Sequence, residues 1–340
     1  MQAAIKATEY YLPTTVVTTA DLAEKFPEWS VEKIDKKTGI SERHIAGPDE
    51  CSSDLAFAAA QKLFSSGIVA PSDIDCLLLC TQSPDYFLPA TACVLQDRLG
   101  LPTSSFALDF NQGCSGFIYG LGIAKGLIET GQVKRVLLLT AETYSKFINP
   151  RDRSVRTIFG DAAAATLIEA VDDNTHAPLI GPFVWGTDGR GATNLIVPSG
   201  GMRCPRSAGT AEEVEDSNGI PRSKDNLFMD GAEIFEFTLG AVPKAFRELL
   251  ARSGKAQEEI DLFIFHQANR YMLNSLRMAL KLPEDKFYIA MRHCGNTVSS
   301  TIPIALNHAY AEGRLNKGDL VMLVGFGVGY SWGATLVRWV

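Results

Sequence analysis

A cysteine at the junction of an apolar run and a helical run is well placed for covalent chemistry. Residues 111–117 read Asn-Gln-Gly-Cys-Ser-Gly-Phe, the run 106–110 before them has strand character, and the run 117–129 after them is helical. A thiol at a helix N-terminus meets unpaired N–H groups and the helix dipole, which favour the thiolate. The turn resembles a nucleophile elbow with Cys114 as the nucleophile. A buried structural cysteine is the alternative interpretation.

Two further polar side chains and a glycine-rich loop follow in the second half of the chain. His266 comes directly after the apolar run 262–265, Asn296 follows a glycine, and residues 325–330 read Gly-Phe-Gly-Val-Gly-Tyr. A lone histidine is usually structural, and an asparagine after glycine is an ordinary turn signal. Together with a candidate thiol, however, an imidazole and a carboxamide indicate an acyl-transfer site.

These residues need a scaffold that brings distant segments together, and an internal repeat supplies one. Three segments of the first half are echoed in the same order in the second: 72–75 by 258–261, 135–140 by 319–324, and 165–168 by 334–337. The repeat predicts two αβ halves, 1–170 and 171–340. Alternating strands and helices predict helix-covered, mostly parallel sheets, and the carboxyl ends of equivalent strands are where α/β folds bind ligands.

Hydrophobic periodicity predicts the remaining elements. Strand 74–81 is apolar without alternation and should be buried on both faces. Segment 171–226 shows no clear pattern, and 199–224 within it reads as a surface excursion. Helices are expected over 53–66, 90–99 and 229–253, the last with Gly254 as its C-cap.

Composition excludes several classes of protein. The 340 residues are 46% hydrophobic with a formal net charge of −7, which describes a globular protein without a nucleic-acid footprint. No apolar run reaches the ~20 residues of a membrane span, and residues 1–6 lack a signal-peptide core. Seven cysteines without a CxxC pair and five scattered histidines favour a reduced cytoplasmic protein with no metal site.

The motifs in combination resemble those of β-ketoacyl-[acyl-carrier-protein] synthase III, a family of the thiolase-like superfamily. The resemblance covers nearly the whole chain, and asparagine in the third catalytic position favours this type over the elongating synthases. It implies an α-β-α-β-α sandwich of two duplicated halves. The motifs are Lys37-Thr38-Gly39-Ile40 with Arg43-His44, Gly113-Cys114-Ser115-Gly116-Phe117, Phe159-Gly160-Asp161-Ala162-Ala163, His266-Gln267-Ala268-Asn269, Gly295-Asn296-Thr297, Phe326-Gly327-Val328-Gly329 and Trp332-Gly333.

The resemblance implies a decarboxylative Claisen condensation that starts fatty acid synthesis. Cys114 would be acylated by an acyl-CoA, and a malonyl thioester carried by acyl carrier protein would lose CO2 and attack the acyl-enzyme. His266 and Asn296 would donate hydrogen bonds to the malonyl thioester oxygen. Backbone N–H groups of Cys114 and of the loop at Val328 and Gly329 would hold the oxyanion of acyl transfer.

The resemblance also implies a binding tunnel for coenzyme A, which is a substrate, and no cofactor. Lys37 stands where many members have arginine, and Lys33 where many have the tryptophan that stacks on adenine. Valine in the loop at 326–329 replaces a glycine and would reshape the acyl pocket. The implied CoA contacts are Lys37, Arg153, Gly231, Phe235, Ala268 and Asn269, and the implied acyl-pocket residues are Phe87, Leu88, Phe326 and Val328.

Family members are homodimers, and the Pro-bounded loop carrying Phe87 would cap the partner's acyl pocket. Tyr271 and Glu236 occupy positions that are basic in carrier-docking members, so an acidic carrier protein would meet a weak positive field. A specialised acyltransferase of secondary metabolism, with another acyl donor or acceptor, is therefore one alternative. A non-catalytic partner subunit is another, although retention of all three candidate catalytic side chains argues against it.

Overall fold

A five-stranded sheet forms the first half of the molecule. A computed structural model describes residues 1–172 and 178–340, so residues 173–177 of the unassigned segment 171–226 lie outside the described part. The strand order is β1-β7-β6-β4-β5. Its strands are β1 (Gln2–Tyr11), β4 (Cys76–Cys80), β5 (Phe106–Phe110), β6 (Arg135–Glu142) and β7 (Ala162–Val171).

A four-stranded sheet forms the second half, in the order β13-β14-β15-β8. The echoes in the sequence occupy equivalent places: β13 corresponds to β4, β14 to β6 and β15 to β7. The division at 170/171 stays a prediction; the first sheet ends at Val171, and the first strand of the second sheet begins at Ile180. The strands are β8 (Ile180–Thr187), β13 (Leu262–Phe265), β14 (Leu320–Gly327) and β15 (Ser331–Arg338).

The expectation of mostly parallel sheets is wrong. Only β4–β5, β4–β6 and β13–β14 pair in parallel, whereas β1–β7, β6–β7, β14–β15 and β15–β8 are antiparallel. The connection from β14 to β15 is only residues 328–330, too short for the helical crossover that a parallel pair requires. This tight reversal brings the glycine-rich loop to the end of the sheet.

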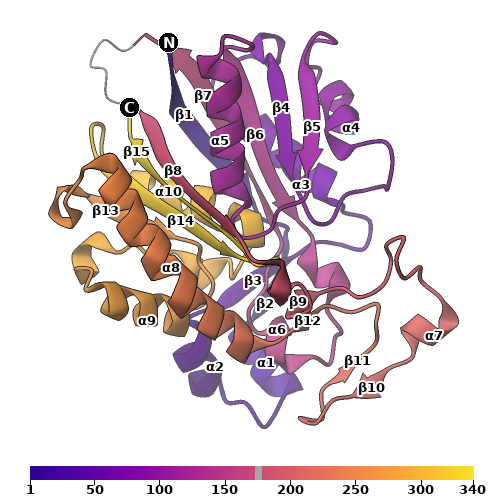
Figure 1. The fold of residues 1–340 in the computed structure, drawn as a ribbon. Helices are drawn as coiled ribbons and strands as arrows, with labels where there is room; N and C mark the ends of the chain where they lie inside the picture. Colours follow the sequence, from indigo (N-terminus) through magenta and orange to yellow (C-terminus); the bar gives the residue numbers. More distant parts are fainter. Residues whose placement is uncertain (173–177) are drawn as a thin grey trace.

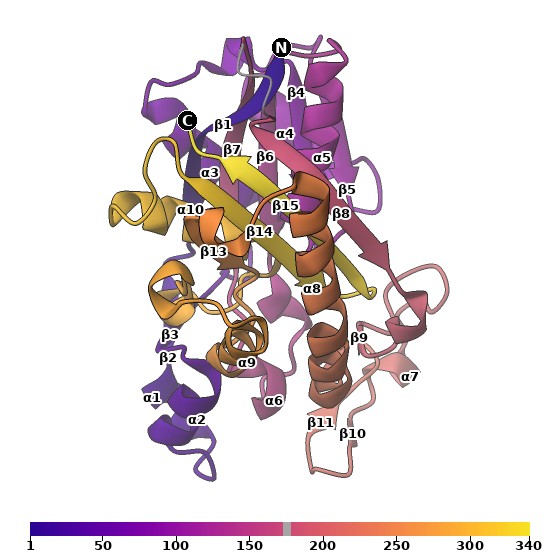
Figure 2. The same cartoon turned by 60° about the vertical axis from the view of Figure 1, so that its left-hand side comes forward.

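Helices cover both faces of each sheet, which gives five layers (Figures 1 and 2). Helices α5 and α10 lie between the sheets, α3 and α4 pack on the outer face of the first, and α8 with α9 covers the second. Because both faces are covered, every residue of β4 and of β14 is buried. The helices are α3 (Ser52–Ser65), α4 (Thr91–Arg98), α5 (Gly116–Glu129), α8 (Gly231–Ser253), α9 (Arg270–Leu280) and α10 (Thr301–Ala311).

The long helix predicted over 229–253 begins two residues later. Asp230 is its N-cap and accepts hydrogen bonds from the N–H groups of Ala232 and Glu233, both at 3.1 Å. Gly254 ends the helix with φ +66°, a left-handed conformation that glycine adopts without strain. The predicted cap at the C-terminus is confirmed.

Smaller elements close the end of the sandwich that lies farther from the two chain termini (Figures 1 and 2). The excursion 199–224 folds as a short helix, α7, and a hairpin, β10–β11, instead of remaining irregular. These elements are β2 (Thr15–Thr18), α1 (Thr19–Lys25), α2 (Val31–Thr38), β3 (Glu42–Ile45), α6 (Arg153–Arg156), β9 (Leu195–Ile196), α7 (Ala208–Ala211), β10 (Val214–Glu215), β11 (Pro221–Arg222) and β12 (Phe228–Met229).

Candidate active site

Cys114 lies in the turn between β5 and α5, as predicted, and is 5% exposed. The glycines around it permit contacts that no other residue would. A Cβ on Gly113 would lie 2.4 Å from Cγ1 of Val328, and one on Gly116 would lie 2.2 Å from Sγ of Cys80. The first contact brings the glycine-rich loop of the second half against the cysteine turn of the first, and the second packs the turn on β4.

The thiol of Cys114 is protonated at neutral pH, contrary to the thiolate expected from its helix position. Burial raises its pKa to about 12, and the nearby Glu142 acts in the same direction. Hydrogen bonds from the N–H groups of Val328 and Cys114 itself lower the pKa. A helix dipole contributes at most ~2 kcal/mol, which lowers a pKa by about 1.5 and does not offset burial. A nucleophilic role for this sulfur would therefore require a neighbouring base to accept the thiol proton.

His266 supplies a neutral imidazole at the end of β13. The residue is 2% exposed, and burial lowers its pKa to about 3. Its Nδ1 lies 2.7 Å from Oγ1 of Thr301, and that hydroxyl donates to the carbonyl of Val298 at 3.1 Å. Because the hydroxyl proton is used there, the network assigns the imidazole proton to Nδ1. Nε2 then carries a lone pair that can accept a proton.

The amide of Asn296 is oriented by its own backbone. Oδ1 accepts the N–H of Val298 at 2.9 Å, so Nδ2 points the other way. Nδ2 lies 3.5 Å from Nε2 of His266 and 3.4 Å from the carbonyl of Ala268. The imidazole and the amide donor thus face the same space, as the motifs predicted.

Glu142, at the end of β6, joins the two halves beneath the site. One carboxyl oxygen accepts the hydroxyl of Ser299 at 2.9 Å, and the other accepts the N–H of Gln82 at 3.1 Å and the hydroxyl of Ser83 at 3.3 Å. The side chain is fully buried, which raises its pKa to about 8. Through Ser299 it holds the turn that follows Asn296, a role that the sequence did not reveal.

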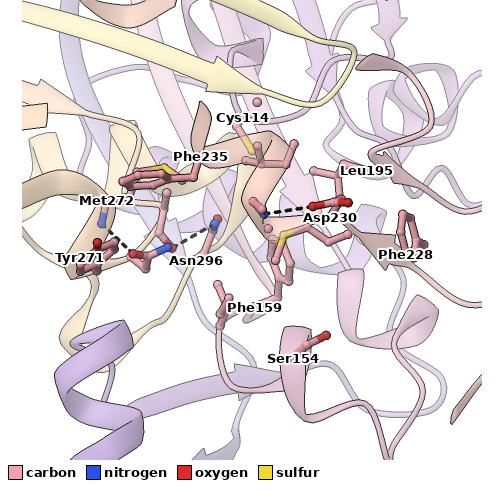
Figure 3. A pocket seen from close by; sticks show the side chains of 18 of the residues that line it. Cys114, Ser154, Phe159, Leu195, Phe228, Asp230, Phe235, Tyr271, Met272 and Asn296 are labelled. Carbon is pink, nitrogen blue, oxygen red and sulfur yellow. Dashed lines mark hydrogen bonds between the residues drawn. The ribbon is translucent and has the colours of Figure 1, made fainter. Parts of the chain in front are cut away.

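A cavity of about 560 Å³ runs past all three predicted catalytic side chains. Figure 3 shows Cys114, Phe159, Phe235 and Asn296 gathered around it. Most of the predicted tunnel residues are in its lining, together with one predicted acyl-pocket residue. The predicted residues in the lining are Lys37, Cys114, Gly231, Phe235, His266, Ala268, Asn269, Asn296 and Phe326.

Five predicted residues do not line this cavity. The guanidinium of Arg153 donates to the carbonyl of Asn218 at 2.8 Å and pairs with Glu28 at 3.3 Å. Val328 reaches the thiol through its N–H, whereas Gly329 does not contribute to the lining.

The loop residues Phe87 and Leu88 lie on the surface of this chain, 79% and 82% exposed. They do not contribute to its own cavity. Their expected place in a partner's acyl pocket stays a prediction.

The sequence interpretation missed one wall of the cavity, the hairpin β10–β11. Asp216, Asn218, Ile220 and Arg222 of this hairpin all line it. Asn218-Gly219 between two short runs is a hairpin signal, so the turn itself was readable. The ion pair between Arg222 and the buried Asp152 links the hairpin to the start of α6, and the sequence does not reveal this contact. Ser154, Asp230, Tyr271 and Met272 also line the cavity and were not predicted.

The described residues contain no cluster of three histidine, cysteine, aspartate or glutamate side chains able to hold a metal ion. In the same part of the chain, no helix combines the length and apolarity needed to cross a membrane.

Known proteins resemble the chain over its full length. Residues 108–189 match the profile of 3-oxoacyl-[acyl-carrier-protein] synthase III, and residues 250–339 match the profile of its C-terminal part. A β-ketoacyl-[acyl-carrier-protein] synthase III of Caldanaerobacter subterraneus subsp. tengcongensis is 39% identical, with 99% of this chain and 98% of the relative covered.

Solved structures agree with these matches. A crystal structure of a 3-oxoacyl-(acyl-carrier-protein) synthase III is 54% identical, with a TM-score of 0.98 over 100% of both chains. A 3-oxoacyl-(acyl-carrier protein) synthase from Burkholderia xenovorans LB400 is 37% identical, with a TM-score of 0.89 over 100% of this chain and 94% of the other. The five-layered thiolase-like fold is thereby confirmed, and the chain belongs to the β-ketoacyl-[acyl-carrier-protein] synthase III family.

Proposed function

We propose that Cys114, His266 and Asn296 carry out the decarboxylative condensation of an acyl-CoA with a malonyl thioester. One observation carries the proposal: a thiol from one half and an imidazole and carboxamide from the other line a single cavity. The cavity volume of about 560 Å³ is within the usual range of small-molecule sites.

The first step transfers the acyl group to sulfur. Nε2 of His266 accepts the thiol proton as Sγ of Cys114 attacks the thioester carbonyl. The N–H of Val328, which bonds the thiol at rest, and that of Cys114 stabilise the oxyanion. The C–S bond to coenzyme A breaks, and the departing thiolate takes the proton from the imidazolium, so that His266 is neutral again.

The second step forms the carbon–carbon bond. The malonyl carboxylate leaves as CO2, and its electron pair passes to the thioester oxygen as an enolate. Asn296 Nδ2 donates to that oxygen. His266 donates to it from Nε2 in its other neutral tautomer, in which water has delivered a proton to Nε2 and taken the one on Nδ1, so that the Thr301 hydroxyl turns to donate to Nδ1. The enolate carbon attacks the acyl thioester, the C–S bond to Cys114 breaks, and the released thiolate takes up one proton from solvent.

The substrate arm is proposed to lie along the cavity. Gly231 has open space where a Cβ would stand, which leaves the N-terminus of α8 accessible to a pantetheine chain. At the mouth, Nζ of Lys37 lies 5.0 Å from the ring centre of Trp29, so cation and aromatic ring stand together beside the space for a nucleotide. Acyl-CoA serves as substrate, and the thioester chemistry requires no metal or redox cofactor.

Acyl carrier protein is the proposed malonyl carrier, with weak electrostatic attraction. Two arginines near the mouth are already paired, Arg270 with Asp35 at 2.7 Å and Arg277 with Glu284 at 3.5 Å. The same pairing favours the second candidate, an acyltransferase of secondary metabolism that takes a different donor or acceptor. Comparing condensation rates with malonyl-CoA and malonyl carrier protein separates the two candidates.

The chain is proposed to act as a homodimer. Strand β5 is an edge of the first sheet and exposes Phe106 (47%) and Leu108 (38%), close in sequence to the loop with Phe87. An exposed apolar edge is suited to pairing with a second copy. Light scattering should give twice the mass of the chain, and Leu108→Lys should give the monomer. A monomeric wild type would contradict the proposal.

All seven thiols are free, which supports a reducing compartment, proposed as the cytoplasm.

Intact-mass measurement after incubation with short acyl-CoAs tests the nucleophile. The wild type should gain one acyl mass, Cys114→Ala should gain none, and Cys93→Ala should behave as wild type. Cys93 is the matched control because it is the exposed thiol, which would take up acyl groups without catalysis. Acylation of Cys114→Ala at the wild-type rate would exclude the mechanism. A wild type that gains no mass from any acyl-CoA would favour a non-catalytic partner subunit.

A further inference from the structure

Two arginines meet in the interior beside the active site, away from any carboxylate partner. Arg43, on β3, is fully buried, and Arg156, at the end of α6, is half-buried. The Nε atoms of both are buried and have no hydrogen-bond acceptor among the described residues. Buried donors are usually satisfied, so two orphaned guanidinium N–H groups in one place indicate a missing acceptor.

The remaining hydrogen bonds of Arg43 reach only neutral oxygens. They go to the carbonyl of Val17 at 3.3 Å, the hydroxyl of Thr19 at 3.2 Å and the carbonyl of Thr157 at 3.0 Å. Other arginines of this region are neutralised, Arg153 by Glu28 and Arg222 by Asp152. Within the described part of the chain, neither Arg43 nor Arg156 forms such a pair, so their charge is not compensated locally.

The neighbouring charged groups do not neutralise the positive charge of Arg43 and Arg156. Burial lowers the pKa of Arg43 to about 10, and the positive charge of Arg156 adds to this effect. Lys25 is a third cation, whose pKa burial and Arg156 both lower, but like Asp21 it is exposed and does not count toward the buried charge. Asp21 acts on Arg43 in the opposite direction, but it is exposed and bonded to Thr18 in the helix cap. Positive charge is therefore in excess at low dielectric, where an unpaired ion is costly.

A cavity of about 10 Å³ lies between the two arginines, which is room for about one water-sized sphere. Its lining holds no carboxylate. The remaining lining is Val17, Ile45, Ser145, Ile148 and Phe159.

We propose that this cavity, here called the arginine cavity, binds a small monovalent anion such as chloride between Arg43 and Arg156. An anion accepts hydrogen bonds from both orphaned N–H groups and also neutralises positive charge. A water molecule can accept the same hydrogen bonds but carries no charge. Phosphate and carboxylate ligands are larger than the space. The proposal concerns a site separate from the one that binds acyl-CoA, and it does not depend on the proposed function.

The arginine cavity lies directly behind a wall of the catalytic cavity. Phe159 lines both cavities. The backbone beside it supports the catalytic amide, because the N–H of Asn296 donates to the carbonyl of Ile158 at 3.0 Å and the N–H of Gly160 donates to the carbonyl of Asn296 at 3.0 Å. An anion held there would stabilise the segment that positions Asn296.

Thermal unfolding of the full chain in sodium chloride and in sodium gluconate, at equal ionic strength, tests the site in solution. At a chloride concentration 100 times Kd, the Tm should rise by about 3–5 °C relative to gluconate. Arg156→Leu should abolish this difference. Arg151→Leu should keep it, because Arg151 is an exposed arginine paired with Glu213 and serves as a control for the loss of one charge.

Crystals grown in bromide provide a direct readout that does not depend on whether the variant folds. An anomalous peak between the two guanidinium groups, together with the chloride-specific Tm shift, would support the site. Equal Tm in the two salts, the same shift in Arg156→Leu as in the wild type, or a bromide crystal without that peak would each overturn it.

Discussion

We expect the hydroxyl of Thr301 to influence the rate of the acyl transfer in which the His266 imidazole is proposed to accept a proton. Thr301 is 3% exposed and is not part of the cavity lining, so it acts on substrate only through His266. Its oxygen makes two hydrogen bonds, at 2.7 Å to Nδ1 of His266 and at 3.1 Å to the carbonyl of Val298. Thr301→Val keeps the shape and removes both.

The expected cost follows from the groups that are left unpaired. Leaving a buried polar group unsatisfied costs about 1–3 kcal/mol, which corresponds to about a 5- to 150-fold loss in rate. The loss should fall on kcat, because the imidazolium formed during acyl transfer needs an acceptor for its Nδ1 proton. KM for acyl-CoA should change less than about twofold, since Thr301 does not line the cavity.

The assay measures acylation of Cys114 by rapid-quench mass spectrometry and CO2 release from the malonyl thioester. Thr301→Ser restores the hydroxyl and should recover most of the rate, which separates positioning of the imidazole from packing. If Thr301→Val lowers only the Tm and both partial reactions proceed at wild-type rates, the hydrogen-bond network does not tune His266.

Three further outcomes follow from the geometry. In Gly327→Ala the new Cβ would lie 2.9 Å from Sγ of Cys114, so acylation should fall at least about 100-fold while far-UV circular dichroism stays unchanged. The pKa of Glu142 is raised to about 8, so the folded state holds a proton that the unfolded state releases. Unfolding free energy should therefore fall as pH rises toward 8, by at most about 1.4 kcal/mol per pH unit, and Glu142→Gln should flatten that slope in urea titrations between pH 6.5 and 8. Arg222→Ala leaves the buried Asp152 uncompensated and should cost about 3–5 kcal/mol in urea unfolding, whereas adding Asp152→Asn should recover part of it. Unchanged acylation, an unchanged pH slope or an unchanged midpoint, respectively, would contradict these expectations.

Short sequence patterns were sufficient to predict features that depend only on residues close together in the chain. The cap at Gly254 was readable because glycine adopts the left-handed conformation at a helix end without strain, and strand 76–80 was readable because a strand covered on both faces must be apolar throughout. The internal repeat identified the two similar sheets. Strand direction was not readable, because it depends on which strands become neighbours.

The three candidate catalytic residues were predicted from residue type and from the motif around each one. Cys114, His266 and Asn296 each stand at an element boundary with a distinctive motif, and the resemblance to a known family joined them. The motifs did not reveal the protonation states of the Cys114 thiol and the His266 imidazole. The helix position suggested a thiolate, whereas burial and the nearby Glu142 raise the pKa of the thiol to about 12, and burial lowers the pKa of the imidazole to about 3.

By itself the sequence indicated the elements, their duplication and the three side chains proposed to perform the chemistry, because propensity, periodicity and residue type are properties of short segments. Only the tertiary structure decided the antiparallel order of the strands, the place of the hairpin β10–β11 in the wall of the catalytic cavity, and the place of Arg43 and Arg156 in the lining of a second, small cavity. Those features arise from contacts between residues far apart in the chain. Their energies depend on burial and on neighbouring charge, neither of which is encoded at any one position.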